Sequence, residues 1–220
     1  MNKGKNMNRD EMFWDKASKN YDKSEERFEY IHNQTGEKAK KYLSSNNTIL
    51  DLGCGTGTKS CEFSSLVKEV HAIDISSEMI EIAKNKAAKC KADNIYFSQT
   101  TIFDSKYEKE SFDVILAFNM LHTIESPLKI VDRIYELLKA DGLFISTTPC
   151  LNGKKSLLVS MQIYLVRILS KIGLIPISIR RYKNSDIDNF INKEKFKTIE
   201  AEVLFKGASS YFIVVKKQYR

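Results

Sequence analysis

An α/β fold built around a mostly parallel sheet is the architecture that this sequence predicts. From residue 48 onward, short apolar runs alternate with segments of helical periodicity, an order typical of a parallel sheet covered by helices on both faces. The first apolar run leads into glycines at every second position, Gly53, Gly55 and Gly57. Two last strand-like runs are separated only by residues 207–209, which predicts an antiparallel hairpin.

The remaining elements follow from the same periodicities. We expect the first ten residues to be frayed and two helices, over about residues 10–21 and 34–45, to precede the glycine turn. A further helix is expected directly after the turn, over residues 58–66. The strands are expected over residues 48–53, 69–74, 94–98, 112–118, 143–148, 198–206 and 210–216.

Two later helices have recognisable starts. Ser76 is a candidate N-cap, and Glu78 in the first turn suits the positive end of the helix dipole. Pro127, after Ser126, suits the first position of the next helix. The buried stripe of that helix is predicted to be Leu128, Val131, Ile134, Tyr135 and Leu138.

The pattern changes after Pro149. Residues 156–175 are strongly apolar but are interrupted by charged residues such as Arg167 and Lys171, so a membrane span is not predicted. Three interpretations stay open: a buried helix that completes the core, a lid over a hydrophobic substrate pocket, and an amphipathic helix lying on a membrane surface. A helix over residues 184–192 follows.

Composition indicates an ordinary globular chain. The 220 residues are 42% apolar and 29% charged, which suits one domain with a full core. The net charge of +7 is compatible with an anionic partner or with a lysine-rich solvated surface. We expect no nucleic-acid partner, because the lysines are scattered and no RNA-binding signature is present.

The cysteines and the N-terminus indicate a reduced compartment. Cys54, Cys61, Cys90 and Cys150 include no C-x-x-C pair, so neither a zinc site nor any other metal is expected. The first ten residues are polar and lack the apolar stretch of a signal peptide. We therefore expect a cytoplasmic protein with free thiols.

The glycine turn predicts a nucleotide-like cofactor. Glycines without Cβ atoms let a ligand lie directly on the backbone, and the free N–H groups of the following helix face it. The spacing is G-x-G-x-G, whereas dinucleotide-binding turns have G-x-G-x-x-G. Asp51, in the preceding strand, is expected to orient the turn rather than to act as a base.

Residues 49–57 resemble motif I of the class I S-adenosylmethionine-dependent methyltransferases, especially their ubiquinone/menaquinone-type and small-molecule branches. Other segments match this family in the right order, and together they extend over about residues 10–150. They are Trp14-Asp15 with Tyr21-Asp22, residues 72–76, residues 112–115 with 119–122, and residues 138–145. The terminal hairpin also fits, because the family adds a reversed strand to its parallel sheet.

The resemblance implies the detailed architecture. It implies a Rossmann-like doubly wound sheet of seven strands in the order 3-2-1-4-5-7-6, mostly parallel, with an antiparallel strand in the C-terminal hairpin. The whole chain, residues 1–220, is expected to form one methyltransferase domain. Its parts are an N-terminal helical cap (1–45), a cofactor-binding core (46–150), a helical insertion that is a candidate lid (151–193), and the hairpin (194–220).

The resemblance also implies S-adenosylmethionine as the cofactor and a role for each part of its site. Asp74, about 20 residues beyond the glycines, would accept hydrogen bonds from the ribose hydroxyls. Ile75 and Met79 would flank the adenine, and backbone near Gly53 and Ala117 would hold the methionine part. The predicted cofactor-binding residues are Tyr21, Asp51, Gly53, Cys54, Gly55, Gly57, Asp74, Ile75, Met79, Thr101, Ile102, Ala117, Phe118 and Asn119.

One segment departs from the family pattern. Relatives usually have an acidic residue after the third strand that meets the adenine amino group, whereas this chain has Gln99 followed by residues 100–102, Thr-Thr-Ile. The hydroxyl of Thr101 and the backbone of Ile102 are the expected replacements. Asp104 is the alternative if the loop has a different shape.

Methyl transfer is an in-line displacement, so alignment and desolvation are expected to supply most of the catalysis. His122 is the candidate base or substrate contact, but a structural histidine that packs near the methionine end is the favoured interpretation of its position. Tyr21 is either a cap over the active site or a core aromatic residue. His32 and His71 have no comparable sequence context.

The predicted function is methyl transfer to a small or lipophilic acceptor, whose atom may be carbon, nitrogen or oxygen. The alternatives are a non-catalytic protein that binds S-adenosylmethionine and a nicotinamide-dependent oxidoreductase. Peripheral membrane contact through residues 156–175 is one open interpretation, and the chain is expected to be a monomer or a homodimer.

Overall fold

The structure is a computed structural model that describes residues 9–150, 182–191 and 195–218, together with five single residues, 161, 164, 165, 168 and 180. The predicted lid or membrane-contact segment, residues 156–175, lies outside the described residues apart from four of these single positions. The end of the predicted helix over 184–192 also lies outside them.

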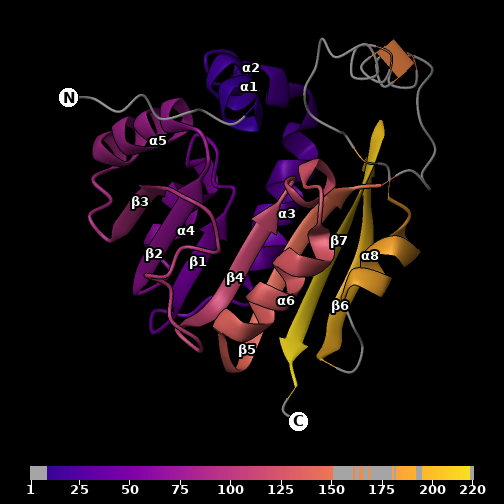
Figure 1. Cartoon of the computed structure of the whole chain (residues 1–220). Helices are drawn as coiled ribbons and strands as arrows, with labels where there is room; N and C mark the ends of the chain where they lie inside the picture. Colours follow the sequence, from indigo (N-terminus) through magenta and orange to yellow (C-terminus); the bar gives the residue numbers. More distant parts are fainter. Residues whose placement is uncertain are drawn as a thin grey trace.

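Seven strands form one sheet in the order β3-β2-β1-β4-β5-β7-β6, which confirms the predicted topology (Figure 1). The strands β1 to β5 pair in parallel, and β7 runs antiparallel to both of its neighbours. Their bounds are β1 Thr48–Leu52, β2 Glu69–Asp74, β3 Ile95–Gln99, β4 Phe112–Phe118, β5 Leu138–Pro149, β6 Phe196–Lys206 and β7 Ala208–Lys217.

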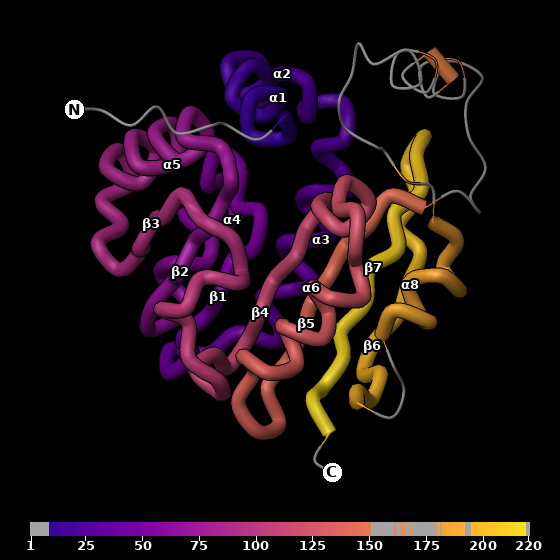
Figure 2. Tube along the Cα trace, viewed as in Figure 1, coloured from indigo at the N-terminus to yellow at the C-terminus, as the bar shows by residue number. Residues whose placement is uncertain are grey.

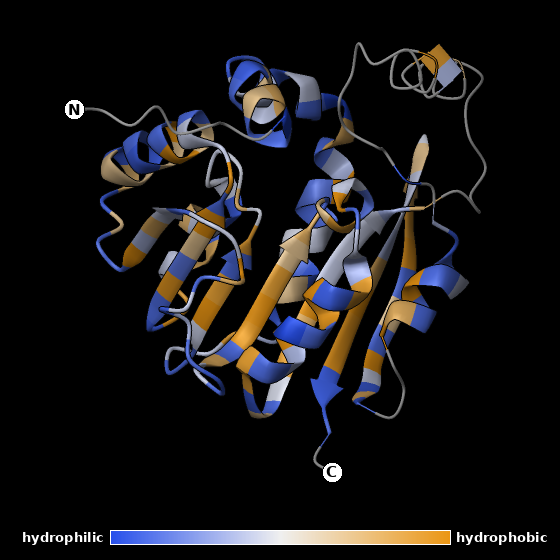
Figure 3. Cartoon of the chain, viewed as in Figure 1, coloured by the Kyte–Doolittle hydropathy of each residue, from blue (hydrophilic) through white to orange (hydrophobic). Residues whose placement is uncertain are grey.

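Helices cover both faces of this sheet. Ile49 and Leu50 are adjacent in β1 and point to opposite faces, yet both are fully buried, as expected of a strand in the middle of a covered sheet. Ile49 belongs to the core that includes Ile31 of α3 and Phe63 of α4, and Leu50 belongs to the core that includes Ile134 of α6. Figure 3 shows that the central strands carry most of the hydrophobic residues.

The helices are α1 Arg9–Ser18, α2 Tyr21–Glu25, α3 Glu29–Lys40, α4 Thr58–Ser64, α5 Ser77–Cys90, α6 Pro127–Leu137 and α8 Asn184–Phe190, with short 3-10 turns η1 Glu26–Phe28 and η2 Leu121–Thr123. The short helices α1 and α2 lie over the edge of the sheet at which β4 ends (Figure 2). Ser76 caps α5 as predicted, since its hydroxyl accepts a hydrogen bond from the N–H of Met79.

Several predicted boundaries were wrong. The helix expected over residues 34–45 begins at Glu29 and ends at Lys40, because η1 and α2 turn the chain before it. Leu138 does not belong to the helical stripe of α6, since it starts β5 and pairs with Phe112 of β4. Leu128 is 55% exposed, because the inward face of α6 is formed by residues such as Ile130 and Ile134.

The terminal hairpin is tighter than predicted. Gly207 alone separates β6 from β7, and its positive φ of 73° is a conformation that glycine adopts without strain. Ala208 and Ser209 therefore pair with Lys206 and Phe205 instead of forming the loop. Among the described helices, none combines the length and the hydropathy that crossing a membrane requires.

Candidate active site

The glycine turn leaves the carboxyl end of β1 and is fixed to the neighbouring strand. The backbone N–H groups of Gly53 and Cys54 both donate to the carbonyl oxygen of Ile73 in β2, at 2.8 and 3.0 Å. Gly53, Gly55 and Gly57 all have positive φ angles, of 71°, 53° and 75°. The turn is therefore a rigid backbone surface at the edge of the sheet where ligands of open α/β folds bind.

Gly57 shows most directly why this turn needs glycine. A Cβ atom at this position would lie 2.7 Å from the Cβ of Ala83 in α5 and 3.1 Å from the ring of Phe97. The residue also begins α4 in a left-handed conformation. Glycine at this position thus lets α4 and α5 approach each other directly behind the turn.

Asp74, at the end of β2, joins the turn to α5. One carboxylate oxygen accepts from the N–H of Gly55 at 3.0 Å, and the other accepts from the N–H of Ser76 at 2.9 Å. Burial raises the pKa of Asp74, while these backbone hydrogen bonds favour its charged form. Each oxygen has a further lone pair, so the carboxylate can also accept from two hydroxyl groups of a ligand.

Asp51 lies beneath the turn, and its carboxylate is hydrogen-bonded to the following helix. Its carboxylate accepts from the hydroxyl of Ser60 in α4 at 2.5 Å, and the residue is buried. Burial raises the pKa of Asp51 to about 6, the Ser60 hydrogen bond lowers it, and the charge of Asp74 raises it. In this structure Asp51 fastens β1 to α4.

Tyr21 covers the outer side of the glycine turn. Its ring carbon Cε1 lies 3.6 Å from the position that a Cβ atom on Gly55 would occupy. Burial raises the pKa of the Tyr21 hydroxyl, and the carboxylates of Glu25 and Asp74 raise it further, so the phenol is neutral. Trp14 packs edge-on against the Tyr21 ring at 6.2 Å between centroids.

Two aspartates of the N-terminal helices attach this aromatic cap to the core. Asp15 of α1 accepts from the hydroxyl of Ser76 at 2.6 Å, at the start of α5. Asp22 of α2 accepts from the hydroxyl of Thr56 at 2.6 Å, inside the glycine turn. The segment that resembles the family's cofactor-covering motif therefore contacts both the turn and the helix after β2.

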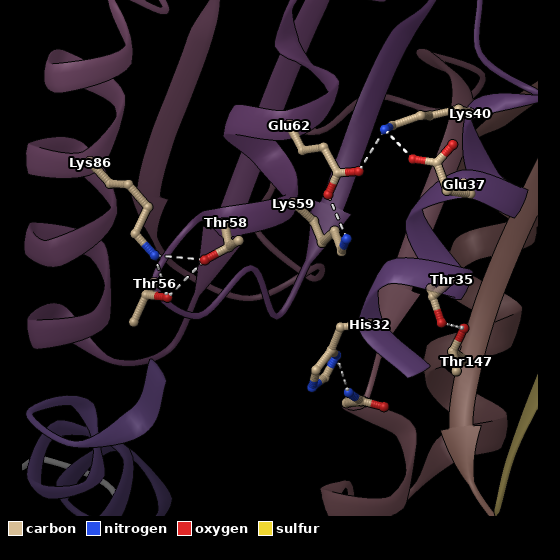
Figure 4. Close-up of polar contacts among 11 residues, drawn as sticks. His32, Thr35, Glu37, Lys40, Thr56, Thr58, Lys59, Glu62, Lys86 and Thr147 are labelled. Carbon is tan, nitrogen blue, oxygen red and sulfur yellow. Dashed lines mark hydrogen bonds and ion pairs between the residues drawn. The ribbon is translucent and has the colours of Figure 1, made fainter. Parts of the chain in front are cut away.

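Lys86 adds to the contact between Asp22 and the glycine turn. Its ammonium group donates to the hydroxyls of Thr56 and Thr58 at 3.1 and 2.6 Å (Figure 4). It also donates to the carboxylate of Asp22 at 3.1 Å. One lysine of α5 thus connects α2, the glycine turn and the start of α4.

The predicted adenine side lies between β2 and β3. Met79 is buried at the first turn of α5, and Ile75 is half-buried. Gln99 is the first residue of the segment that departs from the family pattern, and its amide donates to Glu11 at 2.7 Å and to the carbonyl of Ile75 at 3.1 Å. Gln99 therefore links α1 to the strand ends.

In the loop after β3, the residues predicted to contact adenine differ in their exposure to solvent. Thr101 is exposed, and its hydroxyl accepts from the N–H of Phe103 at 3.3 Å. The side chain of Ile102 is buried in the core instead of facing outward. The Asp104 carboxylate accepts from Thr100 at 2.8 Å and from the Lys106 N–H at 3.0 Å, so it stabilises the loop itself.

The end of β4 supplies the next part of the site. Ala117 is buried, and Phe118 packs edge-on against Phe63. Asn119 has a positive φ of 54°, and its N–H donates to the carbonyl of Thr147 at 2.8 Å. Its side-chain oxygen Oδ1 is buried and accepts from no described residue.

His122 follows in η2. Burial lowers its pKa to about 4, against the opposing influence of the Glu25 charge, so the imidazole is neutral at pH 7. Its Nδ1 atom is buried and has no partner among the described residues. A neutral ring with one unsatisfied nitrogen is suited to hydrogen bonding with a ligand and is a weak base.

His32 is a residue that sequence reasoning missed. Its Nε2 lies 3.0 Å from the carboxylate of Glu25, and its Nδ1 lies 3.4 Å from the amide nitrogen of Asn119. The seven-residue separation of Glu25 and His32 would place both on one helical face, but the sequence predicts a helix only from residue 34. His71 lies elsewhere, against the rings of Tyr96 and Phe112.

The site fits a cationic nucleoside ligand with an amino-acid part. Asp74 presents a carboxylate to hydroxyl groups, and the buried Asn119 oxygen is an acceptor without a described donor. Burial raises the pKa of the Cys54 thiol, and the neighbouring charges of Asp51 and Asp74 raise it further. Within the described residues, no group of three or more metal-ligating side chains is arranged to hold a metal ion.

Comparison with known proteins identifies the family. A family model described as a methyltransferase domain matches residues 43–202. A ubiquinone biosynthesis O-methyltransferase of Haemophilus ducreyi is 34% identical over 152 residues, covering 66% of this chain and 61% of that protein. The uncharacterised methyltransferase YcgJ of Bacillus subtilis is 31% identical over 101 residues, covering 46% of this chain and 40% of that protein. The chain thus spans less than two thirds of these relatives.

Solved structures show the same fold. The crystal structure of YcgJ has a TM-score of 0.69 at 18% identity and covers 86% of this chain and 100% of that chain. Geranyl diphosphate C-methyltransferase from Streptomyces coelicolor, solved with Mg²⁺, geranyl diphosphate and S-adenosyl-L-homocysteine, has a TM-score of 0.66 at 11% identity. It covers 84% of this chain and 78% of that chain.

The family match, the strand order and the glycine turn agree with one another. At the level of the family, they confirm the predicted enzyme class and the predicted cofactor, S-adenosylmethionine. The chain belongs to the methyltransferase-domain family, within the S-adenosylmethionine-dependent methyltransferases that its sequence resembles.

Proposed function

We propose that this chain transfers the methyl group of S-adenosylmethionine to a small-molecule acceptor. The observation that carries the proposal is the position of the Asp74 carboxylate, which is bonded to Gly55 of the rigid glycine turn beneath the ring of Tyr21. This arrangement supports the proposal, because a carboxylate that can accept from ribose hydroxyls lies beside the glycine turn at the carboxyl edge of the sheet.

Each part of the cofactor has a proposed set of contacts. Asp74 would accept from the ribose hydroxyls, and Ile75 with Met79 would flank the adenine. Thr101 remains the proposed partner of the adenine amino group, since its hydroxyl is exposed beside the loop that Asp104 stabilises. The cofactor-binding list of the sequence analysis otherwise stays as a prediction, including Cys54, Ile102, Ala117 and Phe118.

The cofactor supplies an activated methyl group, and this chain's residues align the reactants and exclude water. Tyr21 contributes a neutral phenol over the glycine turn, and its burial supports the proposed role of a cap. His122 has a pKa of about 4, which favours hydrogen bonding to the acceptor over strong general-base catalysis at pH 7. Alignment is therefore proposed as the main source of rate enhancement.

The class of the acceptor molecule is proposed from the similar proteins, and the atom that receives the methyl group is left open. The similar proteins include a ubiquinone biosynthesis O-methyltransferase and a geranyl diphosphate C-methyltransferase, so oxygen and carbon both occur among the methylated atoms. A small lipophilic acceptor is the proposal that suits both. Function resides in the site rather than in the fold, so the acceptor atom requires a direct assay.

The two alternatives are not favoured. A nicotinamide-dependent oxidoreductase would have its third glycine one residue later, whereas Gly57 completes a G-x-G-x-G turn. A non-catalytic binding protein was suggested by the unusual segment after β3, yet Gln99 has a structural explanation in its bonds to Glu11 and Ile75.

Calorimetry tests the proposal first. S-adenosylmethionine should bind to the full chain and NADH should not, and preferential binding of NADH would refute the assignment. A panel of phenols, carboxylic acids, amines and prenylated compounds should then be screened for S-adenosylhomocysteine production. Binding without turnover on any acceptor would favour the non-catalytic alternative.

Other properties stay predictions of the sequence. The cytoplasmic location, the monomeric or homodimeric state and any peripheral membrane contact need separate measurements. Sedimentation of the full chain with anionic vesicles would test the membrane contact, and its absence would leave the lid and the core helix as the interpretations of residues 156–175.

A further inference from the structure

A chain of three polar side chains connects the N-terminal cap to the end of β4. Glu25 of α2 accepts from His32 Nε2 at 3.0 Å, and Asn119 Nδ2 lies 3.4 Å from His32 Nδ1. His32 belongs to α3, which is itself fastened to β5 by a buried hydrogen bond between Thr35 and Thr147 (Figure 4). The middle residue of the chain is therefore held by secondary structure.

The direction of these hydrogen bonds follows from the first partner. A carboxylate only accepts, so the neutral ring of His32 carries its proton on Nε2 and presents a lone pair on Nδ1. That lone pair can accept only from the NH₂ group of Asn119, which fixes the orientation of the amide. The free atom of the amide is consequently Oδ1, the buried atom that has no partner among the described residues.

A buried acceptor without a donor is costly, so this oxygen points to a ligand. Asn119 also holds a left-handed backbone conformation, with φ of 54°, which places its side chain directly after β4. Glu25 supplies a negative charge behind His32, and the nearby imidazole of His122 is neutral. The local charge therefore favours a cationic donor over a neutral one.

We propose that Glu25 and His32 are positioning residues that orient Asn119 Oδ1 to accept a hydrogen bond from the ammonium group of the methyl donor's amino-acid part. The inference rests on the proposed function and deepens it, because it assigns two residues of the N-terminal cap to recognition of the methionine end. It also makes cofactor binding depend on the position of α2, the helix of the N-terminal cap that contains Glu25.

A double-mutant cycle with calorimetry tests this assignment. Each of His32→Ala and Asn119→Gly should weaken S-adenosylmethionine binding about tenfold, the scale of one charge-assisted hydrogen bond. Glycine tolerates the positive φ at position 119, so this change removes the amide without adding strain. The combined variant should bind no more weakly than Asn119→Gly alone, because His32 acts only through Asn119.

A second ligand and two further variants serve as controls. 5′-Methylthioadenosine lacks the amino-acid part, so its affinity should be equal in the wild type and in all of these variants. His32→Gln can still donate to Glu25 and accept from Asn119, and it should bind within about threefold of the wild type. His71→Ala changes a histidine far from this chain of contacts and should have no effect on binding.

The outcomes separate the positioning role of Glu25 and His32 from the assignment of the cofactor. Additive losses in the double variant, or an equal loss of 5′-methylthioadenosine binding, would overturn the positioning role while the cofactor assignment stands. No rescue by His32→Gln, in a variant whose thermal unfolding matches that of the wild type, would also overturn it. Failure of the wild type to bind S-adenosylmethionine would overturn both the inference and the proposed function.

Discussion

The two ends of the candidate site are held in different ways. At the glycine turn, backbone groups make the contacts: Asp74 accepts from two N–H groups, and Gly53 donates to the carbonyl of β2. At the end of β4, side chains make the contacts, and Asn119 and His122 each have a buried polar atom without a described partner. The contacts of the first end are therefore made within the described residues, whereas the second end leaves two buried polar atoms without a partner there.

This difference has a physical cause. The glycine turn follows directly from two adjacent parallel strands, so its shape is set by the sheet and by φ angles that glycine allows. The β4 end receives side chains from α2 and α3, which are distant from β4 in sequence, and from η2, which follows β4 directly. The glycine turn therefore depends on local backbone geometry, whereas the β4 end depends on how separate segments pack together.

The largest expected effect concerns the rigidity of the turn. Gly57→Ala should lower the free energy of unfolding by about 3 kcal/mol, because it adds a clash with Ala83 to the strain of a positive φ. The matched control is Gly207→Ala, which has a similar φ of 73° and no atom within 4 Å of the new Cβ. Its loss should be only about 1 kcal/mol by urea unfolding. Equal losses would show that the contact with α5 is unimportant.

Cofactor affinity should depend strongly on the carboxylate beside the turn. Asp74→Ala should weaken S-adenosylmethionine binding by on the order of 2 kcal/mol, because the ribose hydroxyls lose a charged acceptor. Asp132→Ala is the control, since that carboxylate of α6 accepts from Lys195 and is not among the proposed cofactor contacts. Affinity that is unchanged in Asp74→Ala would mean that Asp74 serves only to hold Gly55 and Ser76.

Ionisation of Asp51 should lower the free energy of unfolding as pH rises. Its pKa is raised from 3.8 to about 6, so between these values the folded chain keeps a proton that the unfolded chain has lost. Relative to the wild type, Asp51→Asn should therefore gain stability from pH 4 to pH 7, on the order of 2 kcal/mol. Urea unfolding across this range measures the difference, and parallel pH profiles would contradict the expectation.

His122 should produce the opposite pH dependence at the β4 end. Its pKa is lowered from 6.5 to about 4, so below pH 6.5 the unfolded chain binds a proton that the folded chain does not. The contribution of His122 to wild-type stability should thus rise from pH 4 to pH 6.5, and relative to the wild type His122→Asn should lose on the order of 2 kcal/mol across this range. The same unfolding series provides the measurement, and parallel profiles of variant and wild type would show that His122 is not buried in solution.

The smallest expected effect concerns the attachment of the cap. Lys86→Met removes the ammonium group shared by Asp22, Thr56 and Thr58, and should accelerate cofactor release about twofold, in line with the ~0.5 kcal/mol of a partly exposed pair. Lys84→Met is the control on the same helix, because Lys84 pairs only with Glu81 among the described residues. Stopped-flow displacement measures both rates, and equal rates would indicate that the cap is held by other contacts.

Sequence patterns predicted the regions whose structure is set locally or by the sheet. The glycine spacing, Asp74 at the end of β2 and Ser76 as the helix cap are local features, and each lies where it was predicted. Leu128 was assigned to the wrong face of α6, because periodicity does not show how a helix is rotated against its sheet.

The N-terminal cap was the least predictable part. The sequence analysis predicted neither α2 nor the first residues of α3, so it missed the contact between Glu25 and His32. Short polar helices have weak periodicity, so their boundaries are set by contacts with the core rather than by their own sequence. The bonds of Gln99 were unpredictable for the same reason, since they join residues that are far apart in the chain.

The sequence by itself determined the fold class, the family and the methyl-donor end of the site, because strand alternation and glycine turns are encoded by neighbouring residues. Only the tertiary structure revealed that Glu25, His32 and Asn119 form one chain of contacts, and that His122 is buried and neutral. Hydrogen-bond direction and pKa depend on partners and burial, which arise when segments distant in sequence pack together.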